Sequence, residues 1–180
     1  MIFLVIAAVG ALFVFYKLWA AVPSEQKYEK FSAVSSFFTL AVAFSAAFVA
    51  YDQLNESKLA SAKSIYKDYI SLAFANPNFS AASYPIESPK FESFKPGSEE
   101  YEKYEYFVGF LLYSAESILP LVGDDENWYS TLSDQLMYHA LYLKSGKANI
   151  ENYSPQIDSI VNEAIRRYEE EALEKRVQPS

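Results

Sequence analysis

Two ionisable side chains of this sequence lie inside apolar runs, where they could carry chemistry. Glu116 stands within LLYSAESIL and His139 within LMYHALYL. A carboxylate among apolar side chains is costly to bury unless it is paired, so we expect Glu116 to meet a basic partner. Such a group serves either as a general acid or base with a shifted pKa or in a polar network that fixes helix packing. We expect the packing role, in a network formed by Glu116, His139, Arg166 and Arg167.

Composition excludes most other chemistry. The chain has no cysteine and a single histidine, which rules out disulfides, thiolate chemistry and a multi-histidine metal site within one chain. The acidic run at 124–126 lacks the alternating acids, the Gly and the closing Glu of a calcium loop. With five glycines in all, the sequence has no phosphate-cradling loop. We therefore expect no metal, no cofactor and no enzymatic activity.

Charge also restricts the partners. The formal net charge is −8 at pH 7, and no basic stripe interrupts the acidic C-terminal part. A phosphate backbone would be repelled by such a surface. We expect no nucleic acid partner.

Aromatic residues gather between positions 101 and 113 and cover more than one face of the helix predicted there. Some of them belong to a core. The surplus predicts an exposed patch for a partner or for the membrane surface. The candidate interaction surface comprises Tyr101, Tyr104, Tyr106, Phe110 and Tyr113.

Two segments near the start of the chain, 2–22 and 31–51, are each long and apolar enough to span a bilayer, which takes roughly 20 residues. Tyr16, Lys17 and Trp19 suit the interface at one end of the first segment. A cleavable signal peptide is the alternative for that segment, but its start lacks positive charge. The linker PSEQKYEK is short, so we expect an antiparallel transmembrane hairpin.

Small residues recur at a spacing of four along both segments. Such rows let helices approach closely in lipid, where packing holds them together. The alternative is that Ala and Ser are merely tolerated there. The candidate packing residues are Ala7, Gly10, Ala11, Ala43, Ala46, Ala47 and Ala50.

The sequence pattern of the rest of the chain predicts helices. No Gly or Pro occurs from Ser24 to Ala75, and a helix satisfies its own backbone in lipid and in water alike. One helix should therefore run through the end of the second span without a break. We expect a transmembrane hairpin over 1–51 and an acidic helical domain over 52–180. Its helices should cover 52–75, 99–119, 125–145 and 155–174, with an aromatic and Pro-containing loop at 76–98, giving an all-α fold whose second membrane helix continues into a small four-helix bundle.

The segments SIYKDYISLAFANPNFS, YEKYEYFVGFLLYSAESIL, NWYSTLSDQLMYHALYL and YSPQIDSIVNEAI follow one another in this order. In this order they resemble a group of bacterial membrane-anchored helical-domain proteins to which no reaction is assigned. The resemblance implies two transmembrane helices, a small cytoplasmic helical domain and a bacterial inner membrane.

Two functions remain open on this basis. The first is a non-enzymatic, membrane-anchored interaction protein, an accessory or regulatory component of an inner-membrane assembly, binding a protein partner or further copies of itself. The second is a membrane-disrupting effector of a toxin or phage-defence system, whose cytoplasmic domain senses a trigger. Lysines flank both sides of the second span, so charge only weakly favours a cytoplasmic domain over a periplasmic one.

Overall fold

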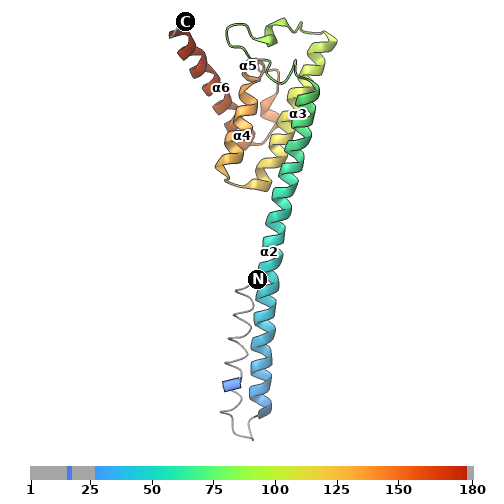
Figure 1. Ribbon diagram of the computed structural model, residues 1–180, viewed down its shortest axis with the longest axis vertical. Coiled ribbons are helices and arrows are strands. Elements are labelled where there is room, and N and C mark those ends of the chain that lie inside the picture. Colours follow the sequence, from blue (N-terminus) through green and yellow to red (C-terminus); the bar gives the residue numbers. More distant parts are fainter. Residues whose placement is uncertain (1–15, 18–26, 178–180) are drawn as a thin grey trace. The chain divides into compact units, whose positions relative to one another are not determined.

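The computed structural model describes residues 16–17 and 27–177, and among them it contains helices and no strand. The α-helices are α2 (Lys27–Ala75), α3 (Glu99–Val122), α4 (Glu126–Met137), α5 (Ala140–Lys144) and α6 (Pro155–Val177). Two short 3₁₀ helices, η2 (Lys90–Ser93) and η3 (Ile150–Asn152), lie in the connections (Figure 1). The predicted all-helical class is confirmed.

The chain forms two compact units that meet between Leu54 and Asn55, close to the boundary predicted at 51/52. That junction falls inside α2, which is one uninterrupted helix of 49 residues. The absence of Gly and Pro explains why no residue there ends the helix. The first predicted span, 2–22, and its packing residues Ala7, Gly10 and Ala11 lie outside the described residues.

From Val34 onward, α2 is long and apolar enough to cross a membrane, and its most apolar stretch has no buried residue. Ser36, Thr39 and Ser45 donate their hydroxyls to backbone carbonyls four residues earlier, at 2.9, 3.0 and 2.9 Å. Each hydroxyl is thus satisfied within its own helix, as a lipid environment requires.

α3 is the second described helix long and apolar enough for a span. Nearly half of its most apolar stretch is buried inside the second unit. Ser98 caps its start by accepting the N–H of Tyr101 at 3.1 Å, and three glutamates occupy the first turn, where the helix dipole favours them. These are the features of a core helix.

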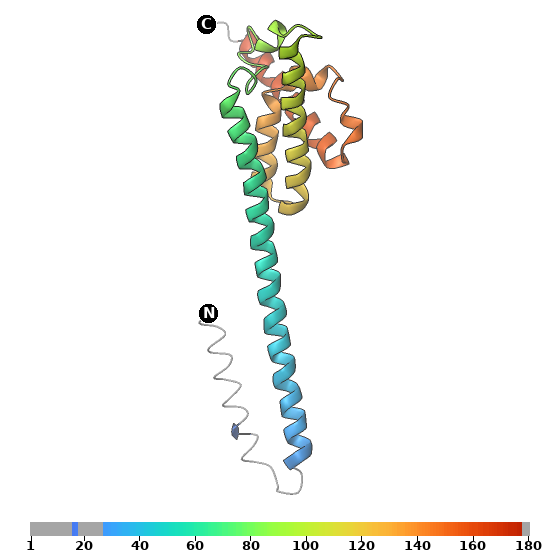
Figure 2. The same ribbon diagram turned by 90° about the vertical axis from the view of Figure 1, so that its right-hand side faces the viewer.

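The second unit is built around α3. The final part of α2 lies beside α3 in both views (Figures 1 and 2), and Tyr69 of α2 packs on Phe107 of α3 with ring centroids 5.9 Å apart. α4 and α5 pack on α6, and α3 contacts both α4 and α6. The fully buried aliphatic side chains include Val108, Leu111, Ile118, Leu132, Leu136, Ile157 and Ile160.

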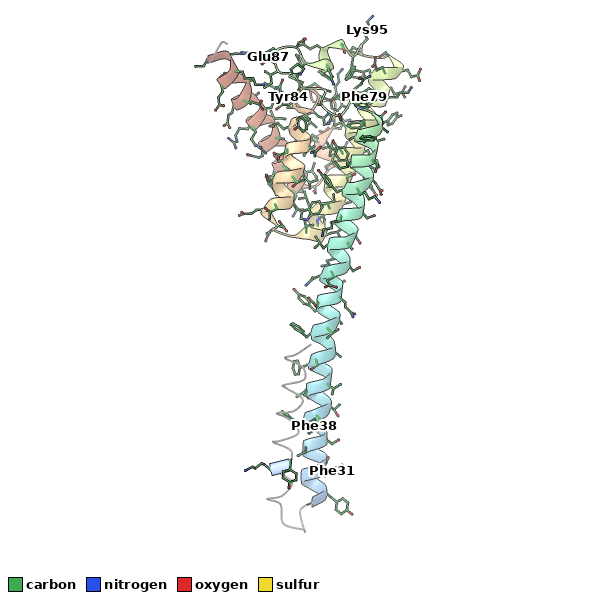
Figure 3. All side chains as sticks on the ribbon, in the orientation of Figure 1. Phe31, Phe38, Phe79, Tyr84, Glu87 and Lys95 are labelled. Carbon is green, nitrogen blue, oxygen red and sulfur yellow. The ribbon has the colours of Figure 1, made fainter. Side chains whose placement is uncertain are left out.

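The loop at 76–98 is pinned onto the helices, as its aromatic content predicts. Phe79 and Phe94 are buried against Tyr104, at ring distances of 5.9 and 4.9 Å. Tyr84 packs on Tyr138 at 5.2 Å, whereas Glu87 and Lys95 of the same loop are exposed (Figure 3). The loop therefore closes one end of the aromatic core.

Ser83 fixes this loop through three hydrogen bonds. Its N–H donates to the carbonyl of Tyr138 at 2.8 Å, its Oγ accepts the N–H of Leu141 at 3.1 Å, and its carbonyl accepts the hydroxyl of Tyr168 at 3.1 Å. Ser83 is fully buried. It joins the loop to α4, α5 and α6 at a single point.

The helix predicted over 125–145 is in fact two helices, α4 and α5, separated at Tyr138 and His139. The prediction failed because no Gly or Pro marks the break. In a continuous helix the Tyr138 carbonyl and the Leu141 N–H would bond within the helix. Ser83 takes both groups instead, so the interruption is a tertiary effect.

Two other helices run further than predicted. α3 continues past Pro120 to Val122 and ends at Gly123, which adopts φ +60°. Pro120 removes one hydrogen bond in the last turn only, and glycine tolerates the positive φ that follows. α6 extends to Val177, where Lys175 pairs with Glu171 one turn earlier at 3.3 Å.

Replacing Ser83 by alanine should lower the free energy of unfolding of the second unit by about 1–3 kcal/mol, because the part-buried Leu141 N–H loses its acceptor. Urea unfolding of the detergent-solubilised chain, followed by Trp128 fluorescence in a Trp19→Phe background, measures this. Ser88→Ala, at an exposed position of the same loop, serves as the control and should change stability by less than about 0.5 kcal/mol. Equal effects of the two substitutions would contradict the assignment.

Candidate interaction surface

Burial of the apolar face of α3 decides which of its residues face outward. Glu99, Lys103, Tyr106, Phe110, Tyr113 and Ser117 follow one another at alternating spacings of four and three. This spacing keeps side chains on one stripe of a helix. We call these residues the α3 seam.

The exposed aromatic part of the seam consists of Tyr106, Phe110 and Tyr113. Their exposed fractions are 72, 37 and 64%. An exposed apolar stripe on a core helix is a candidate contact surface.

Tyr101 and Tyr104, the other two members of the predicted surface, belong to the core instead. Both are buried. Lys147 covers the Tyr101 ring at 4.8 Å from its centroid and donates to its hydroxyl at 2.9 Å. Tyr104 lies among the rings of Phe91, Phe94 and Tyr142. Tyr101 and Tyr104 are buried because they lie on the opposite face of α3 from Tyr106 and Tyr113.

A groove of about 360 Å³ runs beside the seam, between the end of α2 and α3. Its wall is mostly apolar and includes Leu72, Phe79 and Phe107, with Lys103 and Asn76 at its edge. The Asn76 amide is held by the Leu72 carbonyl at 2.9 Å. The groove offers space for an apolar side chain beside Tyr106 and Phe110.

The predicted polar network is not assembled. The Glu116 carboxylate accepts the backbone N–H of Ser154 at 2.8 Å, just before α6. Arg166 pairs with Glu163 and Glu170 on the exposed side of α6, at 2.7 and 2.5 Å. Glu116 therefore meets neither His139 nor the two arginines, because a backbone donor at the start of α6 satisfies it first.

Arg167 is held by α4. Its guanidinium forms an ion pair with Asp134 at 2.6 Å and donates to Ser133 Oγ at 3.3 Å. This bridge joins α6 to α4. Sequence reasoning could not select Asp134, because the pairing depends on how α6 packs against α4.

His139 is fully buried at the break between α4 and α5. Its Nδ1 lies 3.1 Å from the Tyr104 hydroxyl, and its ring centroid is 5.5 Å from that of Phe107. Burial raises the pKa of the Tyr104 hydroxyl and lowers the pKa of His139 to about 3. The imidazole is then neutral, and its tautomer decides whether the Tyr104 hydroxyl or Nδ1 is the donor. Nε2 has no hydrogen-bond partner among the described residues.

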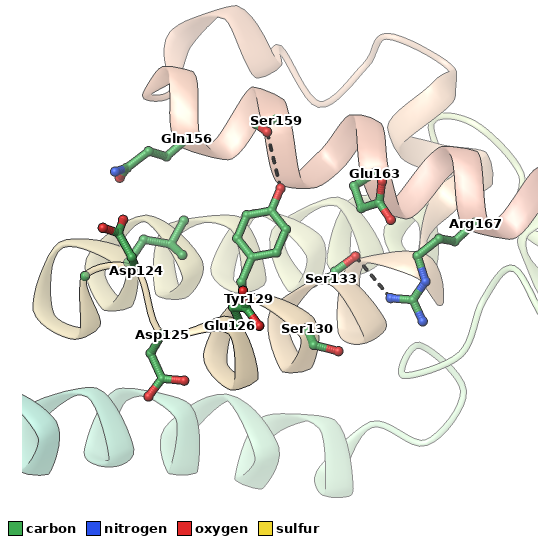
Figure 4. Close-up of a pocket in the computed structure, with 12 residues that line it drawn as sticks. Asp124, Asp125, Glu126, Tyr129, Ser130, Ser133, Gln156, Ser159, Glu163 and Arg167 are labelled. Carbon is green, nitrogen blue, oxygen red and sulfur yellow. Dashed lines mark hydrogen bonds between the residues drawn. The ribbon is translucent and has the colours of Figure 1, made fainter.

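A second groove, of about 680 Å³, lies between α4, α6 and the turn before α4 (Figure 4). Tyr129 and Ser159 share a hydrogen bond of 3.2 Å across it. Asp125 at its rim is engaged as the helix cap, accepting the N–H of Asn127 at 2.9 Å, and Glu163 is paired with Arg166 at 2.7 Å. Asp125 and Glu163 thus serve the fold.

The described residues contain no group of three or more His, Asp or Glu side chains placed to hold a metal ion.

In the second span, the four alanines predicted for packing, Ala43, Ala46, Ala47 and Ala50, are all exposed.

No family model matches this chain, and neither a curated protein nor a solved structure matches it.

Glu116→Ala should destabilise the second unit by about 1–3 kcal/mol, because the Ser154 N–H loses a charged acceptor. Glu116→Gln keeps an acceptor oxygen and should cost less. Glu102→Ala, at an exposed position of the same helix, is the control and should be near neutral. Urea unfolding of the three variants measures this order of stabilities. A Gln variant as unstable as the Ala variant would contradict the hydrogen-bond role.

Protonation of His139 should destabilise the fold as the pH falls. Its pKa is about 3 when folded and 6.5 in a model peptide, so the unfolded state binds the proton first. Its contribution to stability is complete above pH 6.5 and is lost toward pH 3, by up to about 1.4 kcal/mol per pH unit. Unfolding between pH 6.5 and 5 measures the slope above the usual carboxylate range.

His139→Gln provides the control for this slope. The variant should lose that part of the pH dependence, whatever its absolute stability. An NMR titration of the single imidazole should show it neutral at pH 5. An imidazole that titrates near 6.5 in the folded protein would contradict the assignment.

Proposed function

We propose that the protein is a membrane-anchored interaction protein, an accessory or regulatory component of a bacterial inner-membrane assembly. The segments 2–22 and 31–51 act as a hairpin anchor, and the C-terminal helices act as a small four-helix bundle on the cytoplasmic side. The bundle binds a protein partner through the α3 seam. The observation that carries this proposal is the exposure of Tyr106, Phe110 and Tyr113 on a helix whose other face is the centre of the core.

The state of the ionisable residues supports a role without catalysis. His139 has no exposed surface, and the Glu116 carboxylate is engaged by the Ser154 N–H. A general acid or base must come within hydrogen-bonding reach of its substrate. Neither of the two residues whose sequence context suggested such chemistry is presented in that way.

Anchoring is supported by the composition and the exposure of α2. Its apolar stretch is not buried by the described residues. Large exposed side chains, among them Phe37, Leu40, Phe44 and Phe48, cover it. In water such a surface would drive aggregation, whereas the hydrocarbon of a bilayer accommodates it.

The cytoplasmic placement is tested with a single introduced cysteine, since the chain has none of its own. Ser88→Cys lies on the exposed loop of the second unit. A membrane-impermeant maleimide should leave this residue unlabelled in spheroplasts and label it once they are lysed. Labelling of intact spheroplasts would place the unit in the periplasm and overturn this part of the proposal.

The interaction itself is tested by mild-detergent purification of the tagged chain from its native membrane. A protein partner should co-elute at constant stoichiometry. Replacing Tyr106 and Tyr113 by alanine should weaken the complex by about tenfold or more, as expected for aromatic anchors. Phe74→Ala, at an aromatic position of α2 that is 89% exposed, is the matched control. A single species of about the mass of one chain would contradict the proposal.

The groove between α4 and α6 favours a second candidate function. Its volume of about 680 Å³ is within the range of small-molecule sites, which suits a domain that senses a trigger for a membrane-disrupting hairpin. Membrane potential during expression separates the two functions. Cells that stay polarised under all conditions in which the chain is expressed would exclude the effector.

A further inference from the structure

We infer that the α3 seam takes a basic amphipathic helix of a different protein. This inference rests on the proposed function and names the chemistry of its partner. Three features of the second unit carry it: the spacing of the seam, the groove beside it and the charge at both of its ends.

The spacing of the seam fits a helix. Lys103, Tyr106, Phe110, Tyr113 and Ser117 repeat at three and four residues, the periodicity with which one helix presents side chains to another. A partner helix laid along α3 would place residues i, i+4 and i+7 against the three exposed rings. A strand or an irregular segment would match only part of this stripe.

The groove gives that helix an anchoring point. Leu72, Phe79 and Phe107 line it beside Tyr106 and Phe110. A large apolar side chain of the partner can enter between α2 and α3, lose its contact with water and pack against rings. Buried apolar and aromatic anchors of this kind provide most of the binding free energy in helix-in-groove complexes.

Charge selects the partner. Residues 99–126, which comprise α3, the turn that follows it and the first residue of α4, contain eight carboxylates and a single lysine, whereas the whole chain has a net charge of −8. Glu99 pairs with Lys103 at 2.6 Å and Glu116 with the Ser154 N–H. Glu100 and Glu102 are exposed near the start of the seam, and residues 124–126 are exposed beyond the end of α3, where Asp125 also caps α4. The uncharged aromatic centre therefore lies between two acidic ends.

These acidic ends favour a basic helix over the other occupants. A second copy of this chain would place its carboxylates opposite the carboxylates of the first, and like charges across an interface are unfavourable. An anionic lipid surface would be repelled as well. A helix with Lys or Arg near both of its ends and apolar residues between them complements the seam in shape and in charge.

Photo-crosslinking of the full chain in its native membrane tests this. A benzophenone amino acid replaces Tyr106 or Tyr113 in turn, and Phe74 on α2 serves as the control position. The crosslinked peptides are identified by mass spectrometry. Both seam positions should capture one segment of another protein, helical in periodicity and with a net positive charge, and position 74 should not.

A peptide probe measures the specificity. A synthetic 21-residue helix carries Leu at a and d positions and Lys at both ends, and its charge-reversed twin carries Glu in place of Lys. Fluorescence anisotropy with the detergent-solubilised chain should show the basic peptide binding at least about tenfold more tightly than its twin. Binding should weaken as salt rises. Tyr106→Ala combined with Tyr113→Ala should weaken it about tenfold or more, whereas Phe74→Ala should leave it unchanged within about twofold.

The outcomes separate this inference from the proposed function. Crosslinks from the seam to a second copy or to lipid, or equal binding of the two peptides, would overturn the basic helix. If the seam captures another protein through a segment that is not basic, the proposed function stands and the inference fails. Capture from position 74 and not from the seam would overturn both the seam and the basic helix. If no protein is captured from any position and none co-elutes, both fail.

Discussion

Burial of one face of α3 is the constraint on which the second unit depends. Val108, Leu111 and Ile118 have no exposed surface, and removing such side chains from water is the main source of stability in a domain of this size. α2 and the aromatic loop close over one end of this face, and α4 and α6 pack along it. Because the inward face is fixed, the outward face is fixed with it, and Tyr106, Phe110 and Tyr113 are left exposed.

The aromatic loop adds a second constraint, centred on Ser83. The buried part of a loop must satisfy its backbone groups without a regular ladder. This one does so by taking hydrogen-bonding groups from the helix that would otherwise run through Tyr138 and His139. The break turns His139 into the core, beside Tyr104 and Phe107. The lone histidine is therefore a structural residue, and its low pKa follows from its burial.

Along α3, the charged residues lie mostly near the ends and the apolar residues in the middle. The acids of residues 99–126 stand mostly at the ends of the seam, and the middle of α3 is apolar on both faces. This is why α3 satisfies the length and composition of a membrane span while its buried face and acidic first turn are those of a core helix. The long apolar part of α2 differs, because the described residues leave it unburied. Burial, more than composition, distinguishes the core helix α3 from the candidate membrane span in α2.

The amino-acid sequence alone determined the helical class and the unbroken course of α2 past Tyr51. The caps at Ser98 and Asp125, which the structure shows, are equally local. These features depend on local chemistry: side-chain caps, the absence of Gly and Pro, and apolar periodicity. The tertiary structure decided which aromatic residues of 101–113 are buried, where Glu116 and Arg167 find their partners, and where the helix after Trp128 breaks. The sequence of the loop does not distinguish Ser83 from Ser80 or Ser88. The hydrogen-bonding role of Ser83 depends on backbone groups that are distant along the chain and reach it only after folding.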